Sequence, residues 1–175
     1  MQPAPFWHPE TVQVLIKIVY VAALSYGCIS DIKSLRIPNA IFLIVLALFF
    51  LHWRVSAPGQ GFASHVVVAC SALLLGFAVY AAGFMGAGDI KLIGALMLWA
   101  GPRDGLAFLM VMAVAGGLFA GLLLITRASM AVWPEAHRYL PSRRLRTWAQ
   151  RGVFPYGVAI CAAGLVLMPA FFAPR

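Results

Sequence analysis

One segment of the chain, residues 55–88, contains no Lys, Arg, Asp or Glu. A helix needs about 20 mostly apolar residues to cross a bilayer, and this segment is long enough to hold such a helix. The rest of the chain is similarly apolar, since 63% of its 175 residues are hydrophobic and only 10% are charged. Soluble domains carry about 25% charged residues, so the composition excludes a water-soluble globular protein.

Gaps between charged residues, together with turn residues, divide the chain into six predicted transmembrane helices. Their hydrophobicity is continuous rather than alternating, which favours helices over a β-barrel. We therefore predict an all-α polytopic membrane protein, with one integral-membrane domain over residues 1–175. The predicted helices cover about 12–30, 37–53, 62–83, 89–101, 106–126 and 153–172, and a basic loop covers 127–152.

Basic residues are distributed unevenly between the two predicted sides of the membrane. Nine of the 13 Lys and Arg residues fall on the side that carries the segments 31–36, 84–91 and 127–152. Cytoplasmic loops are enriched in Lys and Arg, so we expect this side to face the cytoplasm and both termini to lie outside. Topology and the lipid bilayer thus account for the net charge of +8, and no nucleic-acid partner is expected.

Only five acidic residues occur in the chain, and two of them stand at predicted membrane boundaries. Asp31 ends the first predicted helix and Asp89 begins the fourth, both on the basic side. An ionisable side chain at membrane depth is by default a functional-site hypothesis. The structural alternatives are a helix N-cap for Asp89 and pairing of Asp31 with Lys33 or Arg36. Ordinary surface charge is expected for the other three, Glu10, Asp104 and Glu135.

Three small residues, Gly86, Ala87 and Gly88, leave the backbone before Asp89 nearly bare. A helix cap does not need such a run, whereas an extended peptide substrate needs backbone that it can approach closely. Two carboxylates in close contact cannot both ionise easily, so they share a proton. The ionised carboxylate can then activate water while the protonated one donates to the substrate carbonyl. The pattern therefore favours peptide hydrolysis by Asp31 and Asp89.

Three motifs carry a resemblance to a known family. Residues 86–92, GAGDIKL, resemble the GxGD signature of the membrane aspartyl proteases called type IV prepilin peptidases. Residues 31–39, DIKSLRIPN, are similar to the other aspartate motif of that family. Residues 155–160, PYGVAI, are similar to the small form of the family that serves Flp, or tight-adherence, pili. The resemblance covers the chain from about 12 to 172, and the two aspartate motifs in this order make it specific.

The resemblance implies a GxGD protease bundle in which Asp31 and Asp89 are catalytic. It implies cleavage of prepilin and pseudopilin leader peptides at the cytoplasmic face of the bacterial inner membrane. Larger relatives carry a CxxC-containing region linked to N-methylation of the product, whereas the three cysteines of this chain form no CxxC pair. Methyltransferase activity, a cofactor and a metal ion are therefore not expected. Substrate contact or close backbone approach is expected at Gly86, Ala87, Gly88, Pro38, Asn39, Lys91 and Tyr156.

Two other functions are compatible with the same sequence features. A small ion-coupled transporter or channel component would employ Asp31 and Asp89 as ion or proton sites. A structural partner of a secretion machine would need neither carboxylate. Vectorial flux in proteoliposomes distinguishes the transporter from the protease, and substitution of both aspartates distinguishes the structural partner from either.

Several lesser features carry two interpretations each. Lys33 and Arg36 are better explained as topology determinants than as substrate contacts. Lys91 is interpreted mainly as an interfacial anchor, with tuning of the aspartate pair as the alternative. Pro155, Tyr156 and Gly157 are expected either to line the site or to form a kinked helix start with an interfacial Tyr. Gly117 and Gly121 form a small-xxx-small pair that favours helix packing, within the bundle or in a homo-oligomer. The role of the basic loop 127–152 is left open, and the two alternatives are attraction to anionic lipid and contact with substrate.

Overall fold

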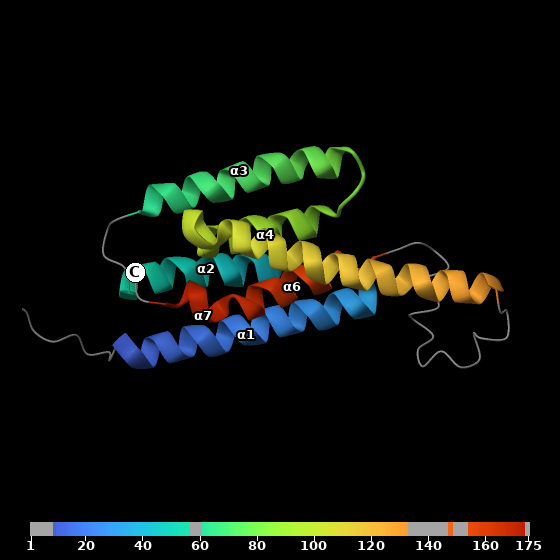
Figure 1. The fold of residues 1–175 in the computed structure, drawn as a ribbon. Coiled ribbons are helices and arrows are strands. Elements are labelled where there is room, and N and C mark those ends of the chain that lie inside the picture. Colours follow the sequence, from blue (N-terminus) through green and yellow to red (C-terminus); the bar gives the residue numbers. More distant parts are fainter. Residues whose placement is uncertain (1–8, 57–60, 133–146, 149–153, 174–175) are drawn as a thin grey trace, which may run out of the picture.

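The computed structural model describes residues 9–56, 61–132, 147–148 and 154–173, and these residues form helices and turns without any strand. Four of the helices are long and apolar enough to cross a membrane, which confirms the predicted all-α polytopic membrane protein. The elements in chain order (Figure 1) are α1 (Pro9–Ser34), α2 (Asn39–Ser56), α3 (Phe62–Ala81), α4 (Ala87–Val132), α6 (Tyr156–Val166) and α7 (Met168–Phe171).

Element α4 contains both the fourth and the fifth predicted helices, 89–101 and 106–126. It is not a straight helix, because Gly101 has the non-helical angles φ 61° and ψ −165°. The chain turns back at this point (Figure 1). A Cβ added at Gly105 would lie 3.2 Å from Met97 Cε, although eight residues of straight helix span about 12 Å. The six membrane crossings stay a prediction. The kink at Gly101 would divide α4 into two of these crossings.

The other predicted boundaries shift by a few residues. α4 continues to Val132, so the first part of the predicted basic loop 127–152 is helical. Most of that loop, apart from 147–148, lies outside the described residues. The predicted last helix, 153–172, is divided at Leu167 into α6 and the short α7.

The first part of α4 is the centre of the bundle. Its residues 92–101 are all buried, as expected for a helix that is apolar on every face. Aromatic polar groups join the surrounding helices: the Trp99 indole N–H donates to the Val45 carbonyl at 3.0 Å, and the Tyr20 hydroxyl donates to the Gly164 carbonyl at 3.1 Å. These hydrogen bonds satisfy the buried donors of Trp99 and Tyr20 and join α4 to α2 and α1 to α6.

Helix α3 lies at the edge of the bundle and packs mainly against α4 (Figure 1). Only His65 and Ala69 are buried on it, while Leu74 and Leu75 are 73% and 70% exposed. Such an apolar outer face suits lipid. Close approach to α4 depends on small residues, because a Cβ added at Gly76 would lie 2.8 Å from Ile90 Cγ2.

The kink in α4 leads to a prediction about stability. At Gly101 the backbone occupies a region that is essentially restricted to glycine, and an added Cβ would overlap the His65 ring. We expect Gly101→Ala to lower the free energy of unfolding by about 2–5 kcal/mol, measured by circular dichroism during titration with denaturing detergent. Gly83→Ala is the control, because Gly83 also has positive φ (78°) but nothing lies within 4 Å of its added Cβ. Equal losses in both variants would show that the contact with His65 is unimportant.

Candidate active site

Asp31 lies in the last turn of α1, with its side chain directed into the bundle and only 4% of the residue exposed. The helix ends just beyond it, where Leu35 has a positive φ of 54° and donates its N–H to the Asp31 carbonyl at 2.8 Å. The Ser30 hydroxyl donates to the Arg36 carbonyl at 3.0 Å and holds the link toward α2. Among the described residues, Asp31 Oδ2 accepts no hydrogen bond although it is buried.

Asp89 lies in the first turn of α4 and is partly exposed. The Gly86 N–H donates to Asp89 Oδ2 at 3.3 Å. In a capping box, the side chain of the third helical residue accepts a hydrogen bond from the backbone N–H of the N-cap residue. The bond between Gly86 and Asp89 is this half of a capping box. Asp89 therefore caps α4 from inside the first turn rather than from the N-cap position itself, and this bond holds its carboxylate at the start of the helix.

The three sequence motifs meet around Ile37, in the link between α1 and α2. A Cβ added at Gly88 would lie 3.4 Å from the Ile37 carbonyl oxygen, and one added at Gly157 would lie 2.7 Å from Ile37 Cδ1. The beginnings of α4 and α6 thus approach the link that follows Asp31. Residues far apart in the sequence form one end of the bundle.

Gly157, in the first turn of α6, lies directly against Asp31. A Cβ added at Gly157 would be 2.8 Å from Asp31 Oδ2, so only glycine fits at this contact without movement. The backbone N–H groups of Gly157 and Val158 approach the carboxylate, and helix N-termini favour negative charge. The sequence allows two interpretations of Pro155, Tyr156 and Gly157, lining of the site or a kinked helix start. It does not predict that Gly157 lies against Asp31.

Asp31 and Asp89 lie close enough together for their charges to interact. The buried Cys161 thiol on α6 is near both of them. Pairing of Asp31 with Lys33 or Arg36 is not observed, since the ion pair found within the described ranges joins Arg103 and Asp104 at 4.0 Å. The two predicted catalytic carboxylates therefore lie at the same end of the bundle, and Asp31 has no cationic partner among the described residues.

Other predicted site residues surround this pair. The Lys91 ammonium donates to Asn39 Oδ1 at 3.4 Å, which joins the first turns of α4 and α2. The Pro38 carbonyl accepts from the Ile41 N–H at 3.0 Å and begins α2. Gly88 faces the chain's own link at Ile37, where an added Cβ would be in ordinary van der Waals contact. The exposed members of the predicted set are Gly86, Ala87, Asn39, Lys91 and Tyr156.

An apolar groove of about 290 Å³ adjoins the site. Tyr156 and Ile160 of α6 form one side, and small residues of the second part of α4 form the other. Gly117 contributes to this groove, and neither Gly117 nor Gly121 has an atom within 4 Å of an added Cβ. Packing of that glycine pair within the bundle is therefore not observed among the described residues. The lining is Met85, Met112, Ala113, Gly116, Gly117, Ala120, Tyr156 and Ile160.

In the described part of the chain, no group of three or more His, Cys, Asp or Glu residues is placed to hold a metal ion. The model of the type IV leader peptidase family matches residues 18–121, more than half of the chain. The matched range contains both Asp31 and Asp89, whereas the 155–160 segment lies beyond it. Searches of the curated proteins and of the solved structures give no match.

Proposed function

The chain belongs to the type IV leader peptidase family, and on that premise we propose that it is an aspartic-type endopeptidase that processes Flp-type prepilins and pseudopilins. It removes the leader peptide at the cytoplasmic face of the bacterial inner membrane and does not methylate the new N-terminus. The observation that carries this proposal is that Asp31 and Asp89 both lie at the end of the bundle where the α1–α2 link contacts the starts of α4 and α6, close enough for their charges to interact.

In the proposed reaction, one carboxyl of the pair is protonated and the other is ionised. The ionised carboxylate takes a proton from water, and the oxygen of that water attacks the carbonyl carbon of the scissile peptide. The protonated carboxyl donates to the carbonyl oxygen as the tetrahedral intermediate forms. Collapse of the intermediate breaks the C–N bond, and a proton passes to the leaving amine. Partial exposure of Asp89 supports access of water to the pair.

Backbone amides, rather than cations, are the polar groups found next to the two carboxylates within the described residues. The N–H of Gly86 bonds to Asp89, and those of Gly157 and Val158 approach Asp31. A cationic partner would favour the ionised form of both groups, which would hinder the sharing of one proton. The lack of an ion pair at Asp31 within the described residues is thus consistent with acid–base catalysis.

The groove beside Tyr156 supports a substrate with a hydrophobic segment next to the cleavage site. Its lining is apolar, with small residues on α4 and the adaptable side chains of Met85 and Met112. Small residues permit close approach of a second helix inside a membrane. A leader peptide followed by an apolar helix matches this combination of a polar pair and an adjoining apolar groove.

The direct test is mass spectrometry of a prepilin after incubation with the purified protein in lipid nanodiscs. We expect a product that lacks the leader and has a free, unmethylated N-terminal amine. A prepilin whose hydrophobic segment is interrupted by two charged residues is the substrate control and should stay intact. An uncleaved wild-type prepilin would contradict the proposed peptidase, and a methylated product would contradict the proposed absence of methylation.

The contact between Lys91 and Asn39 predicts non-additive effects on cleavage. Exposed pairs of this kind contribute about 0.2–1 kcal/mol, so Lys91→Ala and Asn39→Ala should each slow cleavage by up to about fivefold. Because both changes break the same contact, the double variant should be no slower than either single one. Rates that multiply in the double variant would assign the two side chains separate roles, such as membrane anchoring by Lys91.

A further inference from the structure

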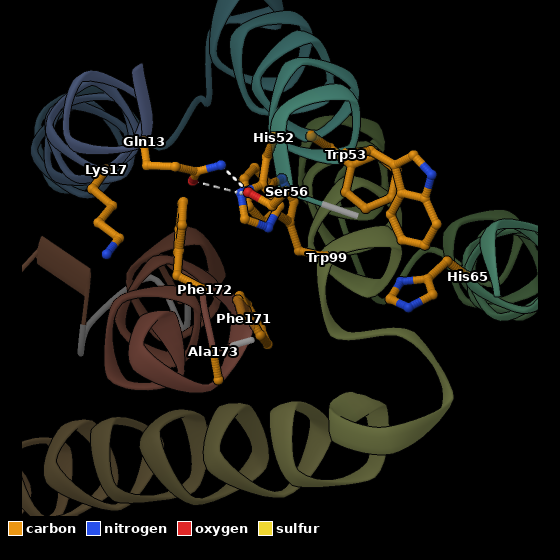
Figure 2. Close-up of a pocket in the computed structure, with 11 residues that line it drawn as sticks. Gln13, Lys17, His52, Trp53, Ser56, His65, Trp99, Phe171, Phe172 and Ala173 are labelled. Atoms are coloured by element: carbon orange, nitrogen blue, oxygen red, sulfur yellow. Dashed lines mark hydrogen bonds between the residues drawn. The ribbon is translucent and has the colours of Figure 1, made fainter. Parts of the chain in front are cut away.

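A second pocket (Figure 2) is lined by residues of the first part of α1. It therefore lies at the end of α1 opposite Asp31. It has a volume of about 260 Å³ and combines polar and aromatic side chains. Lys17 on its wall precedes Asp31 by about four helical turns, or roughly 21 Å along α1. The lining comes from α1, α2, α3, α4 and the C-terminal segment: Gln13, Lys17, Phe49, His52, Trp53, Ser56, His65, Trp99, Phe171, Phe172 and Ala173.

One wall of this pocket is a hydrogen-bonded set that joins α1 to α2 (Figure 2). The His52 Nδ1–H donates to Gln13 Oε1 at 2.9 Å, because that oxygen can only accept. The Gln13 amide Nε2–H donates in turn to Ser56 Oγ. This set fixes the Gln13 amide and the Ser56 hydroxyl at the edge of the pocket. The Phe172 ring, 4.9 Å from both the Trp99 and His52 rings, closes another side.

Lys17 brings a positive charge to the pocket without a matching carboxylate. No Asp or Glu is among the described residues that line it, and Lys17 forms no ion pair within the described ranges. Its Nζ lies 5.6 Å from the centre of the Phe172 ring. The Lys17 residue is partly exposed, and a ring face is a weaker partner for an ammonium group than an anion is. A positive charge with no carboxylate beside it therefore suits the pocket to an anion.

We propose that this pocket binds a phosphate group, carried by the headgroup of an anionic lipid or free in solution. Lys17 supplies the charge, and the Ser56 hydroxyl and Gln13 amide supply neighbouring polar contacts. The volume is slightly below the 300–1,000 Å³ of sites for drug-sized ligands, which suits a headgroup. The pocket lies near the ends of membrane-spanning helices, where a bilayer places its phosphates. This site is independent of the proposed peptidase activity.

The test measures the affinity of the purified protein for phosphatidylglycerol and phosphatidylcholine by native mass spectrometry from detergent. We expect a preference for phosphatidylglycerol that Lys17→Gln reduces about tenfold or more, since hydrogen bonds to charged groups contribute about 1.5–3 kcal/mol. Lys17→Arg should keep the preference. The matched control is Arg54→Gln, which removes an exposed cation at the same end of α2 but outside the pocket, and it should leave binding unchanged.

Two further experiments identify the source of the phosphate and test whether each variant is folded. Displacement of the lipid by millimolar inorganic phosphate would assign the site to free phosphate, and retention would assign it to the lipid headgroup. Gln13→Leu is the second variant and should weaken binding severalfold, with circular dichroism confirming that each variant is folded. Equal affinity for the two lipids together with no phosphate binding would overturn the proposal. So would equal losses in Lys17→Gln and Arg54→Gln, because general surface attraction would then explain the binding.

Discussion

Replacement of either Asp31 or Asp89 by Asn is expected to slow leader cleavage by at least about a hundredfold, the lower end of what general acid–base catalysis contributes. Asn has nearly the same size as Asp, so packing at the buried end of α1 is preserved. An amide can neither hold nor release the proton that the proposed reaction moves. The rate of leader removal from a co-expressed prepilin, normalised to the amount of membrane-inserted protein, measures the effect.

The matched control for these variants is Asp104→Asn. Asp104 pairs with exposed Arg103 beyond the kink of α4, and its substitution should leave cleavage at the wild-type rate. A near-normal rate in Asp31→Asn or Asp89→Asn would contradict the paired mechanism. Loss of vectorial ion flux in proteoliposomes, without any leader cleavage by the wild type, would instead favour the transporter alternative.

Gly157→Ala is expected to lower cleavage by at least about tenfold, although it changes no ionisable group. The added Cβ would lie 2.8 Å from Asp31 Oδ2 and 2.7 Å from Ile37 Cδ1, which is closer than real side-chain atoms approach. Asp31 must therefore move, and small displacements of a catalytic group can cost up to about a hundredfold in rate. Because the carboxylate is displaced and not removed, we expect kcat to fall more than substrate affinity.

The control for Gly157→Ala is Gly121→Ala, a substitution at a glycine whose added Cβ meets no atom within 4 Å. Gly121 lies outside the lining of the apolar groove, so cleavage should be unchanged. Thermal unfolding of both variants separates positioning from folding. A Gly157→Ala protein with normal kcat would show that Asp31 tolerates the shift, and an equal loss in Gly121→Ala would point to a general effect on α-helical packing.

Much of this architecture can be predicted from the sequence. A chain with so few charged residues is expected to form membrane-spanning helices. The positions of Asp31 and Asp89, at the end of one helix and the start of another, already predict that they share a side of the membrane. The family that these motifs resemble is confirmed by the match to residues 18–121. Catalytic roles for the two aspartates stay a prediction that the experiments above address.

Other features depend on tertiary contacts that spacing does not encode. The sequence predicts substrate approach at Gly88, and it does not reveal that Gly88 faces the link at Ile37. The proximity of Gly157 to Asp31 arises because α6 packs between α1 and α4, and no local pattern reveals that arrangement. Hydropathy likewise divides α4 into two helices without predicting the geometry at Gly101, since an apolar window does not specify backbone angles.

In the proposed reaction Asp31 and Asp89 act together on one substrate carbonyl. The most direct measurement is binding of a non-cleavable prepilin peptide whose scissile bond is replaced by a hydroxyl-bearing isostere, compared with the same peptide carrying a methylene there. Transition-state analogues bind at least about a hundredfold more tightly than substrates. We predict that the wild type prefers the hydroxyl peptide and that Asp31→Asn and Asp89→Asn both abolish this preference while binding the methylene peptide normally. Retention of the preference in either variant would contradict the claim.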